Sequence, residues 1–308
     1  MSAPTPPPAV LVLGGTGTVG SRIVSQLLSS QSAHPTTILV ASRNGNGDNN
    51  PKSDPNLQNI SFDWHDTDTW TNPFSTAAGP VKISAVYLIA PPSLNASSLM
   101  TEFIDFARER GVRRFVLQSA SSIEAGGPAM GKVHGFLREL GQRGEVEWAV
   151  LRPTWFQQNF ATQPLHLRGI KEESKIYSAT GEGRIPWVSA DDIAAVAVRA
   201  LTDAEPPNTE YLVLGPELLS YDEIAAILSK ILGRRIVHVD LAPAELEKRY
   251  QDFGMPEDYA RMMSAMDTSI KFGAENRTND AILVMTGAAP RKFGDFAKSV
   301  KEVWEQQA

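Results

Sequence analysis

The chain has 308 residues, of which 42% are hydrophobic and 21% are charged. This length predicts about two domains, and the composition excludes a chain that is disordered throughout. The 35 acidic residues outnumber the 29 basic ones, and a net charge of −6 argues against nucleic-acid binding. Cysteine is absent, which excludes disulfides, thiolate nucleophiles and cysteine-ligated zinc.

No segment reads as a transmembrane helix. The uncharged stretch 83–101 is interrupted by Pro91 and Pro92. No basic side chain precedes the apolar run 9–13, so the start of the chain is a poor export signal. We therefore expect a cytoplasmic protein without a membrane partner, and we expect the proline-rich residues 1–8 to be a disordered leader.

The first half of the chain alternates predicted strands and helices. Apolar helical spacing runs through 21–28 and 99–107, and residues 44–58 form a long polar loop. The predicted strands cover 10–13, 37–41, 60–63, 85–90, 114–119 and 148–151. Such alternation predicts an α/β fold, a Rossmann-type doubly wound parallel sheet.

The second half reads differently. Capping-box patterns precede apolar helices at 189–192 and 220–223, and residues 236–240 alternate like a strand. Helical patterns cover 243–271 and 293–305. We therefore predict a Rossmann domain over 9–153 and a smaller helix-rich C-terminal substrate lobe over 154–308, with segments near 188–215 returning to the sheet.

A glycine-rich loop carries the strongest local signal. Gly14, Gly17 and Gly20 directly follow the first strand and open the first helix. Glycines allow the backbone to approach a pyrophosphate, and a helix N-terminus favours its negative charge. The alternative is a tight turn without a ligand, whereas a P-loop is excluded because no Gly-Lys-Ser/Thr follows. The predicted cofactor-binding residues here are Gly14, Gly15, Thr16, Gly17, Thr18 and Val19.

The end of the second strand indicates which dinucleotide binds. An acid there would hydrogen-bond the adenosine ribose and favour NAD, but the chain has Ser42 and Arg43. A guanidinium suits a 2′-phosphate, so we predict NADP(H) as the cofactor, the alternative being a solvated arginine. Asp63 and Trp64, after the third strand, are expected near the adenine.

A catalytic pair common in short-chain dehydrogenases is missing. Those enzymes use Tyr-x-x-x-Lys to protonate a carbonyl oxygen, yet none of the six tyrosines here has lysine four residues later. Ketone reduction needs such a donor, whereas an iminium carbon accepts hydride directly and becomes a neutral amine. A proton from water, an acid of the second lobe, and no catalysis remain alternatives.

Several segments resemble the NmrA-like atypical short-chain dehydrogenases of fungal indole-alkaloid clusters, in particular the ergot-alkaloid dehydrogenases. The resemblance spans about residues 9–304, although the proline leader and the 44–58 loop depart from it. The segments are 63–64, 84–88, 151–156, 175–183, 188–194 and 215–222. The resemblance implies NADPH-dependent reduction of a cyclic imine or iminium. In other NmrA-like members it implies imine reduction coupled to a cycloaddition.

The remaining cofactor candidates follow later strands. The 153–156 segment comes after the sixth strand, at the edge where ligands bind in such sheets. It is expected to frame the nicotinamide and the substrate's indole, the alternative being a plain aromatic packing cluster. Lys132 would hold the ribose or the cofactor amide and His134 would relay a proton, the alternative for both being surface or capping roles. These candidates are Ala90, Pro91, Ser119, Ala120, Lys132, Pro153, Thr154, Trp155 and Phe156.

Aromatic and methionine side chains suggest a substrate wall. Tyr259, Met262, Met263 and Met266 recur at helical spacing, which fits either a plastic apolar surface for a polycyclic substrate or a core stripe. Asn159 is expected one helical turn beyond Trp155. The predicted substrate-binding residues are Trp155, Phe156, Asn159, Tyr259, Met262 and Met266.

The residues and the resemblance together predict an NADPH-dependent oxidoreductase acting on a C=N bond of an indole alkaloid, with no metal. One alternative couples the reduction to a stereoselective cycloaddition of the Diels–Alder type. A second is an NADP-sensing regulatory protein without turnover. The sequence does not indicate the particular alkaloid, the face of hydride attack or the oligomeric state.

Overall fold

A computed structural model describes residues 8–30, 36–45, 54–76, 79–91, 93 and 96–305. Most of the proline-rich leader and positions 46–53 of the polar loop lie outside these residues. The chain divides into two compact units. Unit 1 comprises Met1–Pro153 and Ile193–Leu212, and unit 2 comprises Thr154–Asp192 and Val213–Ala308.

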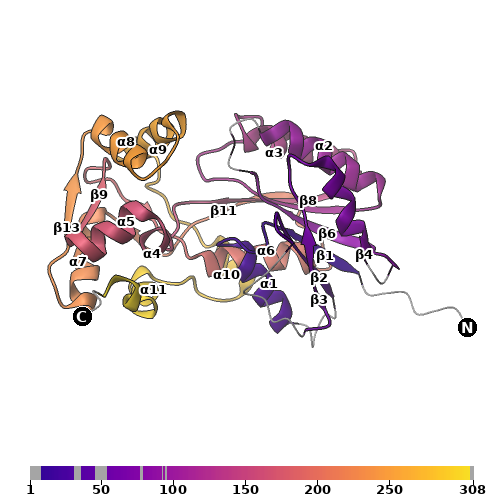
Figure 1. Cartoon of the computed structure of the whole chain (residues 1–308), viewed down its shortest axis with the longest axis horizontal. Helices are drawn as coiled ribbons and strands as arrows, with labels where there is room; N and C mark the ends of the chain where they lie inside the picture. Colours follow the sequence, from indigo (N-terminus) through magenta and orange to yellow (C-terminus); the bar gives the residue numbers. More distant parts are fainter. Residues whose placement is uncertain are drawn as a thin grey trace, which may run out of the picture. The chain divides into compact units, whose positions relative to one another are not determined.

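Unit 1 contains a seven-stranded sheet with helices on both faces (Figure 1). The strands run in the order β11-β8-β7-β6-β1-β2-β3, and the pairings from β8 through β3 are parallel. Their bounds are β1 Ala9–Leu13, β2 Thr37–Ser42, β3 Leu57–Ser61, β6 Ile83–Leu88, β7 Arg114–Gln118, β8 Glu147–Pro153 and β11 Thr209–Val213. The strand order reverses between β1 and β6, the place where ligands bind in such sheets. The predicted Rossmann-type sheet is therefore confirmed.

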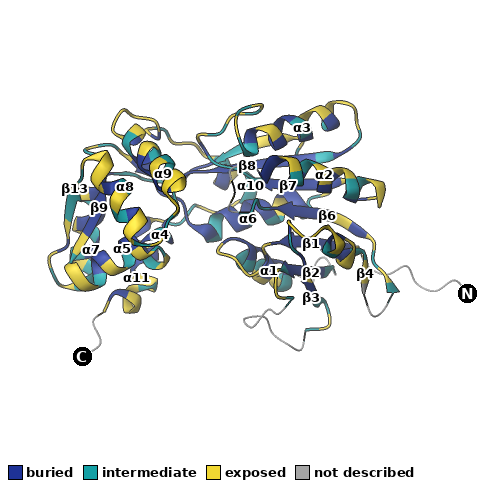
Figure 2. Cartoon of the chain, turned by 45° about the horizontal axis from the view of Figure 1, so that its top comes forward, coloured by how far each residue is buried: buried dark blue, intermediate teal, exposed yellow. Residues whose placement is uncertain are grey.

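Four helices cover this sheet. Helices α2 (Ala96–Glu109) and α3 (Met130–Gln142) lie on one face, and α1 (Gly20–Ser29) and α6 (Ala190–Thr202) lie on the other (Figure 1). The strands between them are buried, whereas the helices are exposed on their outer faces (Figure 2). Burial on both faces explains why the strand β1, Ala-Val-Leu-Val-Leu, is apolar throughout.

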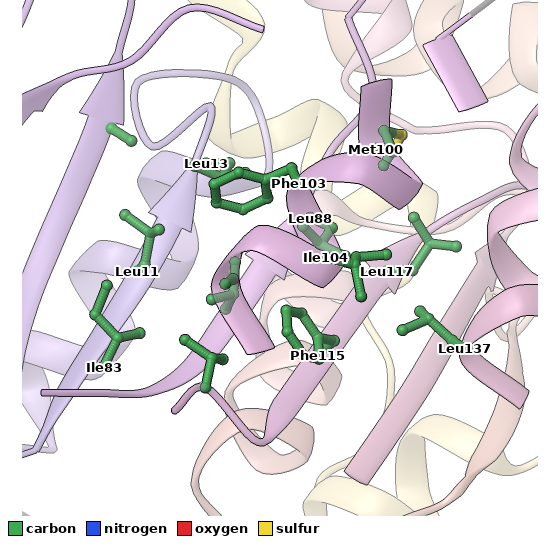
Figure 3. Packing of buried hydrophobic residues seen from close by; sticks show 14 of the residues in the cluster. Leu11, Leu13, Ile83, Leu88, Met100, Phe103, Ile104, Phe115, Leu117 and Leu137 are labelled. Carbon is green, nitrogen blue, oxygen red and sulfur yellow. The ribbon is translucent and has the colours of Figure 1, made fainter. Parts of the chain in front are cut away.

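The core under α2 and α3 consists mainly of aliphatic side chains over the central strands and of aromatic side chains near the edge strand β3. Figure 3 shows side chains of β1, β6 and β7 packed against both helices. At the edge the ring of Phe103 lies 5.1 Å from Phe62 and 5.5 Å from Trp64, both edge-on. These contacts attach the segment after β3 to the sheet. It continues as a 3₁₀ turn (Thr67–Phe74) and the short strands β4 (Ser75–Thr76) and β5 (Gly79–Pro80).

A buried arginine ties three parts of unit 1 together. Arg152 on β8 is 3% exposed. Its Nη1 donates to the carboxylates of Glu124, in the β7–α3 segment, at 2.9 Å and of Glu210, on β11, at 2.6 Å. Its Nη2 donates to the Ser121 carbonyl at 2.8 Å. Arg152 therefore holds the β7–α3 segment against the sheet.

Replacing Arg152 with methionine keeps the bulk of the side chain and removes these bonds. We expect the free energy of unfolding to fall by about 2–3 kcal/mol, because the partner groups lose a buried cation. Urea denaturation followed by tryptophan fluorescence measures this change. A loss below about 1 kcal/mol would show that the network contributes little.

Unit 2 is built from short elements around its own core. Phe160 packs with its ring 4.9 Å from Trp187, and Trp304 Nε1 donates to the Phe160 carbonyl at 2.9 Å. Its strands are β9 (Lys175–Ser178), β10 (Ile185–Pro186), β12 (Leu218–Leu219) and β13 (Val237–Asp240). Its helices are α4 (Asn159–Thr162), α5 (Pro164–Arg168), α7 (Tyr221–Leu232), α8 (Pro243–Asp252), α9 (Glu257–Ile270), α10 (Ala281–Thr286) and α11 (Phe293–Ser299), with π and 3₁₀ turns at Gly169–Glu173 and Lys301–Trp304. No helix of the described residues is both long and apolar enough to cross a membrane.

Unit 2 buries a carboxyl group, Asp267 of α9, which is 1% exposed. Its Oδ2 accepts a hydrogen bond from the Ala179 amide. Burial raises the pKa of Asp267 from an ordinary value near 3.8 to about 7, and the nearby Asp240 adds to this. Folding therefore favours the protonated form, so the stability contributed by this group falls as the pH rises from about 4 to about 7.

Asp267→Asn removes the ionisation while keeping an oxygen that can accept from Ala179. We expect the variant to be more stable than the parent at pH 8, by as much as about 4 kcal/mol, and nearly equal to it at pH 4. Thermal unfolding across this pH range measures the difference. A variant that is less stable than the parent at pH 8 would contradict the assignment, because it would mean that the ionised carboxylate stabilises the fold.

Candidate functional site

The turn from β1 into α1 brings its backbone very close to neighbouring strands. Gly14 has a φ of +63°, and a Cβ on it would lie 2.7 Å from Ile89 Cγ2. A Cβ on Gly15 would lie 2.6 Å from Val40 Cγ1, and one on Gly20 would lie 2.2 Å from the Gly14 carbonyl oxygen. A side chain is therefore excluded at Gly14, Gly15 and Gly20, where the backbone packs too closely to admit one.

The N-terminus of α1 lacks a protein cap. Val19 occupies the N-cap position without a side-chain hydrogen bond, and the first turn contains no acid. Thr16, Gly17 and Thr18 are exposed, whereas Gly15 and Val19 are buried. The positive end of the helix dipole is thus not offset by a capping side chain or by an acid of the first turn, and it lies beside exposed residues, which suits an anion-binding turn.

A cavity of about 360 Å³ lies at the carboxyl ends of β1, β2, β3 and β6. It gathers many of the predicted cofactor-binding residues from four separate segments of unit 1. Those lining it are Gly14, Thr16, Gly17, Ser42, Arg43, Asp63, Trp64, Ala90 and Pro91. The lining also includes Ala41, Phe62, His65 and Ile89, which the sequence analysis did not identify.

One wall of the cavity is the turn after β2. Gly45, with a φ of +62°, donates its amide to the Ser42 carbonyl at 3.2 Å and closes this turn. The Ser61 hydroxyl donates to the Arg43 carbonyl at 3.3 Å, which fixes the backbone. The side chain of Arg43 is exposed at the cavity. Ser42 and Arg43 therefore both line the cavity here, and a hydroxyl and a guanidinium are suitable ligands for a phosphate.

The neighbouring part of the lining follows β3. The carboxylate of Asp63 accepts the His65 amide at 2.9 Å. Trp64 is 8% exposed, and its Nε1 donates to the Ile89 carbonyl at 3.1 Å. Trp64 thus belongs to the core cluster and also borders the cavity. His65 is an exposed residue that no motif marked, and its position directly after Asp63 and Trp64 was the only available signal.

The candidates after β7 lie outside this cavity. The Ser119 amide donates to the Leu151 carbonyl at 2.7 Å, and Ala120 follows it, partly exposed. No partner among the described residues reaches the buried Ser119 hydroxyl. Lys132 is exposed on the first turn of α3. A buried hydroxyl without a protein partner is free to hydrogen-bond a ligand.

His134 is placed differently from the sequence prediction of a proton relay. It is 1% exposed, and its ring centroid lies 5.7 Å from that of Trp148. Burial lowers the pKa of His134, because the surroundings disfavour the charged form. These features favour a packing role for the neutral imidazole between α3 and β8.

The segment after β8 is held by backbone contacts within unit 2. Phe156 and Val188 form an isolated parallel bridge, and Gln158 Oε1 accepts the Ala190 amide at 2.8 Å. Helix α4 begins only at Asn159, so the expectation that Asn159 lies one helical turn beyond Trp155 was wrong. Pro153 ends β8 in unit 1, and Thr154 opens unit 2.

The methionine-rich stripe lies on α9 beside a buried face. The fully buried positions of this helix are Ala260, Ser264, Asp267 and Ile270. At positions of the helix next to these, Tyr259 is 38% exposed, and Met262 and Met266 are partly exposed. Met263 packs against the cluster formed by Leu246 and its neighbours. The stripe is thus divided: Met263 is partly buried against this cluster, whereas Tyr259 is exposed and Met262 and Met266 are partly exposed.

Comparison with known proteins shows the family to which the chain belongs. A family model described as the NmrA-like family matches residues 7–293. The chain belongs to the NmrA-like family. It is 44% identical to festuclavine synthase II of Penicillium roqueforti, over 96% of this chain and 99% of the relative. It is 41% identical to agroclavine dehydrogenase of Claviceps fusiformis, over 96% and 98% of the two chains.

A solved structure with the same fold is the Citrobacter triphenylmethane reductase complexed with NADP(H). Its TM-score is 0.75 at 20% identity, covering 96% of this chain and 99% of the other. The NmrA-like chain has no group of three or more potential metal ligands among the residues described.

The hydroxyl of the buried Tyr87 donates a hydrogen bond to the side chain of Gln118. Tyr87 is therefore not positioned to donate a proton to a substrate.

Proposed function

We propose that the chain is an NADP(H)-dependent oxidoreductase that reduces a cyclic imine or iminium group of an indole alkaloid. The observation that carries the proposal is the cavity at the β1–β6 switch point, where the glycine turn meets Ser42 and Arg43. The festuclavine and agroclavine relatives support an oxidoreductase of alkaloid biosynthesis. The finer assignment to a C=N bond rests on the family resemblance and on the missing Tyr-x-x-x-Lys pair.

The residues of unit 1 fit a dinucleotide phosphate. The glycine turn, which a Cβ would fill, and the uncapped start of α1 would hold the pyrophosphate. Ser42 and Arg43 would bind the 2′-phosphate, and Asp63 would accept from the adenine amino group. Ala90, Pro91, Ser119, Ala120 and Lys132 would follow the ribose toward the nicotinamide, which Pro153, Thr154, Trp155 and Phe156 would frame.

Bound NADPH supplies a hydride. An iminium carbon that accepts it becomes a neutral amine, and no proton transfer accompanies the step. A neutral imine would first take a proton from solvent at its nitrogen and would then react as the iminium. This matches a chain with no Tyr-x-x-x-Lys pair and with His134 buried beside Trp148. The chain's residues then have two tasks, which are orientation of the two reactants and exclusion of water.

The test is NADPH oxidation by the full-length protein with matched substrates. One set contains cyclic iminium and imine precursors built on an indole, and the other contains ketones of similar size. We expect turnover with the first set only. Turnover of ketones alone would contradict the assignment to C=N, and tight NADPH binding without turnover of any substrate would favour a nucleotide sensor.

A coupled cyclisation is judged from the products of the same reaction. A reductase alone yields a simple amine. A product with an additional ring of one handedness, absent from the reaction without protein, would support reduction coupled to a cycloaddition. The accessible Tyr259, Met262 and Met266 of α9 would provide an apolar surface for such a polycyclic substrate.

A further inference from the structure

A histidine to which the proposed function gives no role lines the cofactor cavity of unit 1. His65 is exposed and borders this cavity together with Arg43, Asp63 and Trp64. Within the part of the chain that the structure describes, the His65 imidazole has neither a hydrogen-bond partner nor a contact with another ring. The imidazole is therefore not committed to the fold and is available to a ligand in the cavity.

A tight turn fixes the backbone that carries His65. The Asp66 amide donates to the Asp63 carbonyl at 3.2 Å, and the His65 amide donates to the Asp63 carboxylate at 2.9 Å. The Asp63 amide donates to the Thr69 hydroxyl at 2.9 Å, and Trp70 Nε1 donates to the Asp63 carbonyl at 3.2 Å. A ligand that contacts His65 therefore meets a backbone that is already ordered, which lowers the entropic cost of binding.

The two neighbouring aromatic residues of the lining are packed into the core. Phe62 is 4% exposed and Trp64 is 8% exposed. Their ring centroids lie 5.2 Å apart, and both rings meet Phe103 edge-on. A flat base needs an accessible ring to stack on. Among the described aromatic residues of the lining, His65 is the exposed one.

The segments after β2 and β3 are joined by hydrogen bonds at the cavity. The Phe62 amide donates to the Ser42 carbonyl at 3.0 Å. The Ser61 hydroxyl donates to the Arg43 carbonyl at 3.3 Å. In NADP(H) the adenine and the 2′-phosphate are attached to adjacent carbons of one ribose. A 2′-phosphate held at Arg43 would therefore bring the adenine to the segment after β3.

The charges of this segment favour the base over a phosphate as the partner of His65. Asp63 and Asp66 flank His65, and Asp68 follows in the next turn. These carboxylates would repel a phosphate placed beside them. The adenine ring is uncharged, and its amino group is a donor that a carboxylate such as Asp63 can accept.

We propose that His65 stacks its imidazole on the adenine of the cofactor and thereby contributes equally to the affinity for NADPH and for NADH. Arg43 would then determine the preference between the two dinucleotides, and His65 would determine how tightly either one binds. The inference rests on the cofactor of the proposed function and is independent of the substrate, because the adenine takes no part in hydride transfer.

The test is calorimetric titration of the full-length protein with NADPH, NADH and 2′,5′-ADP, the last of which keeps the adenine and the 2′-phosphate but lacks the nicotinamide. We expect His65→Ala to raise the three dissociation constants by a similar factor, about 5- to 50-fold, because each ligand carries the same base. His65→Phe keeps a ring but neither nitrogen, and it should bind all three ligands nearly as the parent does.

Two further variants show whether the effect belongs to stacking at this position. Phe272→Ala removes a ring that is 82% exposed in unit 2 and does not line the cavity, so all three dissociation constants should stay unchanged. Arg43→Ala should weaken NADPH and 2′,5′-ADP but not NADH, a pattern different from that of His65→Ala. Without nucleotide, His65→Ala should melt at the temperature of the parent, because the imidazole has no partner among the described residues.

The inference is overturned if His65→Ala binds all three ligands as the parent does. It is also overturned if His65→Ala weakens NADPH and 2′,5′-ADP but not NADH, which would make His65 a phosphate ligand. Equal weakening by His65→Phe and His65→Ala would contradict stacking as well. A parent protein that binds NADPH but reduces no C=N substrate would contradict the proposed function alone, whereas a parent that binds no NADPH would overturn both.

Discussion

Gly20→Ala is expected to abolish NADP(H) binding. A Cβ at this position would lie 2.2 Å from the Gly14 carbonyl oxygen and 2.9 Å from the Gly15 Cα. Both are backbone atoms of the phosphate turn, so the clash is relieved only by moving that turn away from α1. We expect a loss of NADPH affinity of more than about 100-fold and a loss of stability of about 2–4 kcal/mol. Fluorescence titration with NADPH and thermal unfolding measure the two effects.

Gly294→Ala is the matched control. It makes the same change within a helix of unit 2, where the nearest atom to a new Cβ is Ile227 Cγ2 at 4.0 Å. We expect wild-type NADPH affinity and a gain in stability of up to about 1 kcal/mol. If Gly20→Ala bound NADPH as the parent does, the assignment of this turn to the pyrophosphate would be wrong.

Arg43→Ala is expected to produce the second large effect, a loss of preference for NADPH over NADH. The guanidinium of Arg43 is exposed at the cavity beside Ser42. A charge-assisted hydrogen bond to a phosphate contributes about 1.5–3 kcal/mol, so the NADPH dissociation constant should rise about 10- to 100-fold. NADH has no 2′-phosphate, and its dissociation constant should change little. Titration of both dinucleotides with both proteins measures the two ratios.

The control is Arg110→Ala, which removes an arginine from the surface of unit 1. The Arg110 guanidinium lies 3.5 Å from the centroid of the Phe106 ring and does not line the cavity. Its removal should leave both dissociation constants unchanged. If Arg43→Ala weakened NADPH and NADH equally, Arg43 would be supporting the turn or the pyrophosphate and not reading the 2′-phosphate.

The fold was predictable because its signals are local. A buried strand followed by glycines and a helix requires only neighbouring residues to recognise, and the predicted Rossmann-type sheet and NmrA-like resemblance are confirmed. Strand limits were less accurate. The strand predicted at 60–63 is observed at Leu57–Ser61, because Phe62 and Trp64 leave the ladder to pack against Phe103.

Residues of the candidate site were predictable only where a short sequence motif marks them. His65 lies in a polar stretch without periodicity, and only the folded chain places it beside the cavity. His134 shows the opposite case, since its sequence position suggested chemistry while the helix turns it into the core. The assignments of the individual site residues remain predictions, which the variants above address.

The most direct measurement of the central claim is single-turnover incubation of the full-length protein with NADPH deuterated at C4 and a cyclic indole iminium. Mass spectrometry and NMR of the product locate the label. The account predicts one deuterium at the former iminium carbon, in a single configuration, with a stoichiometric yield of NADP⁺. Absence of deuterium from every product, despite tight binding of NADPH, would contradict it.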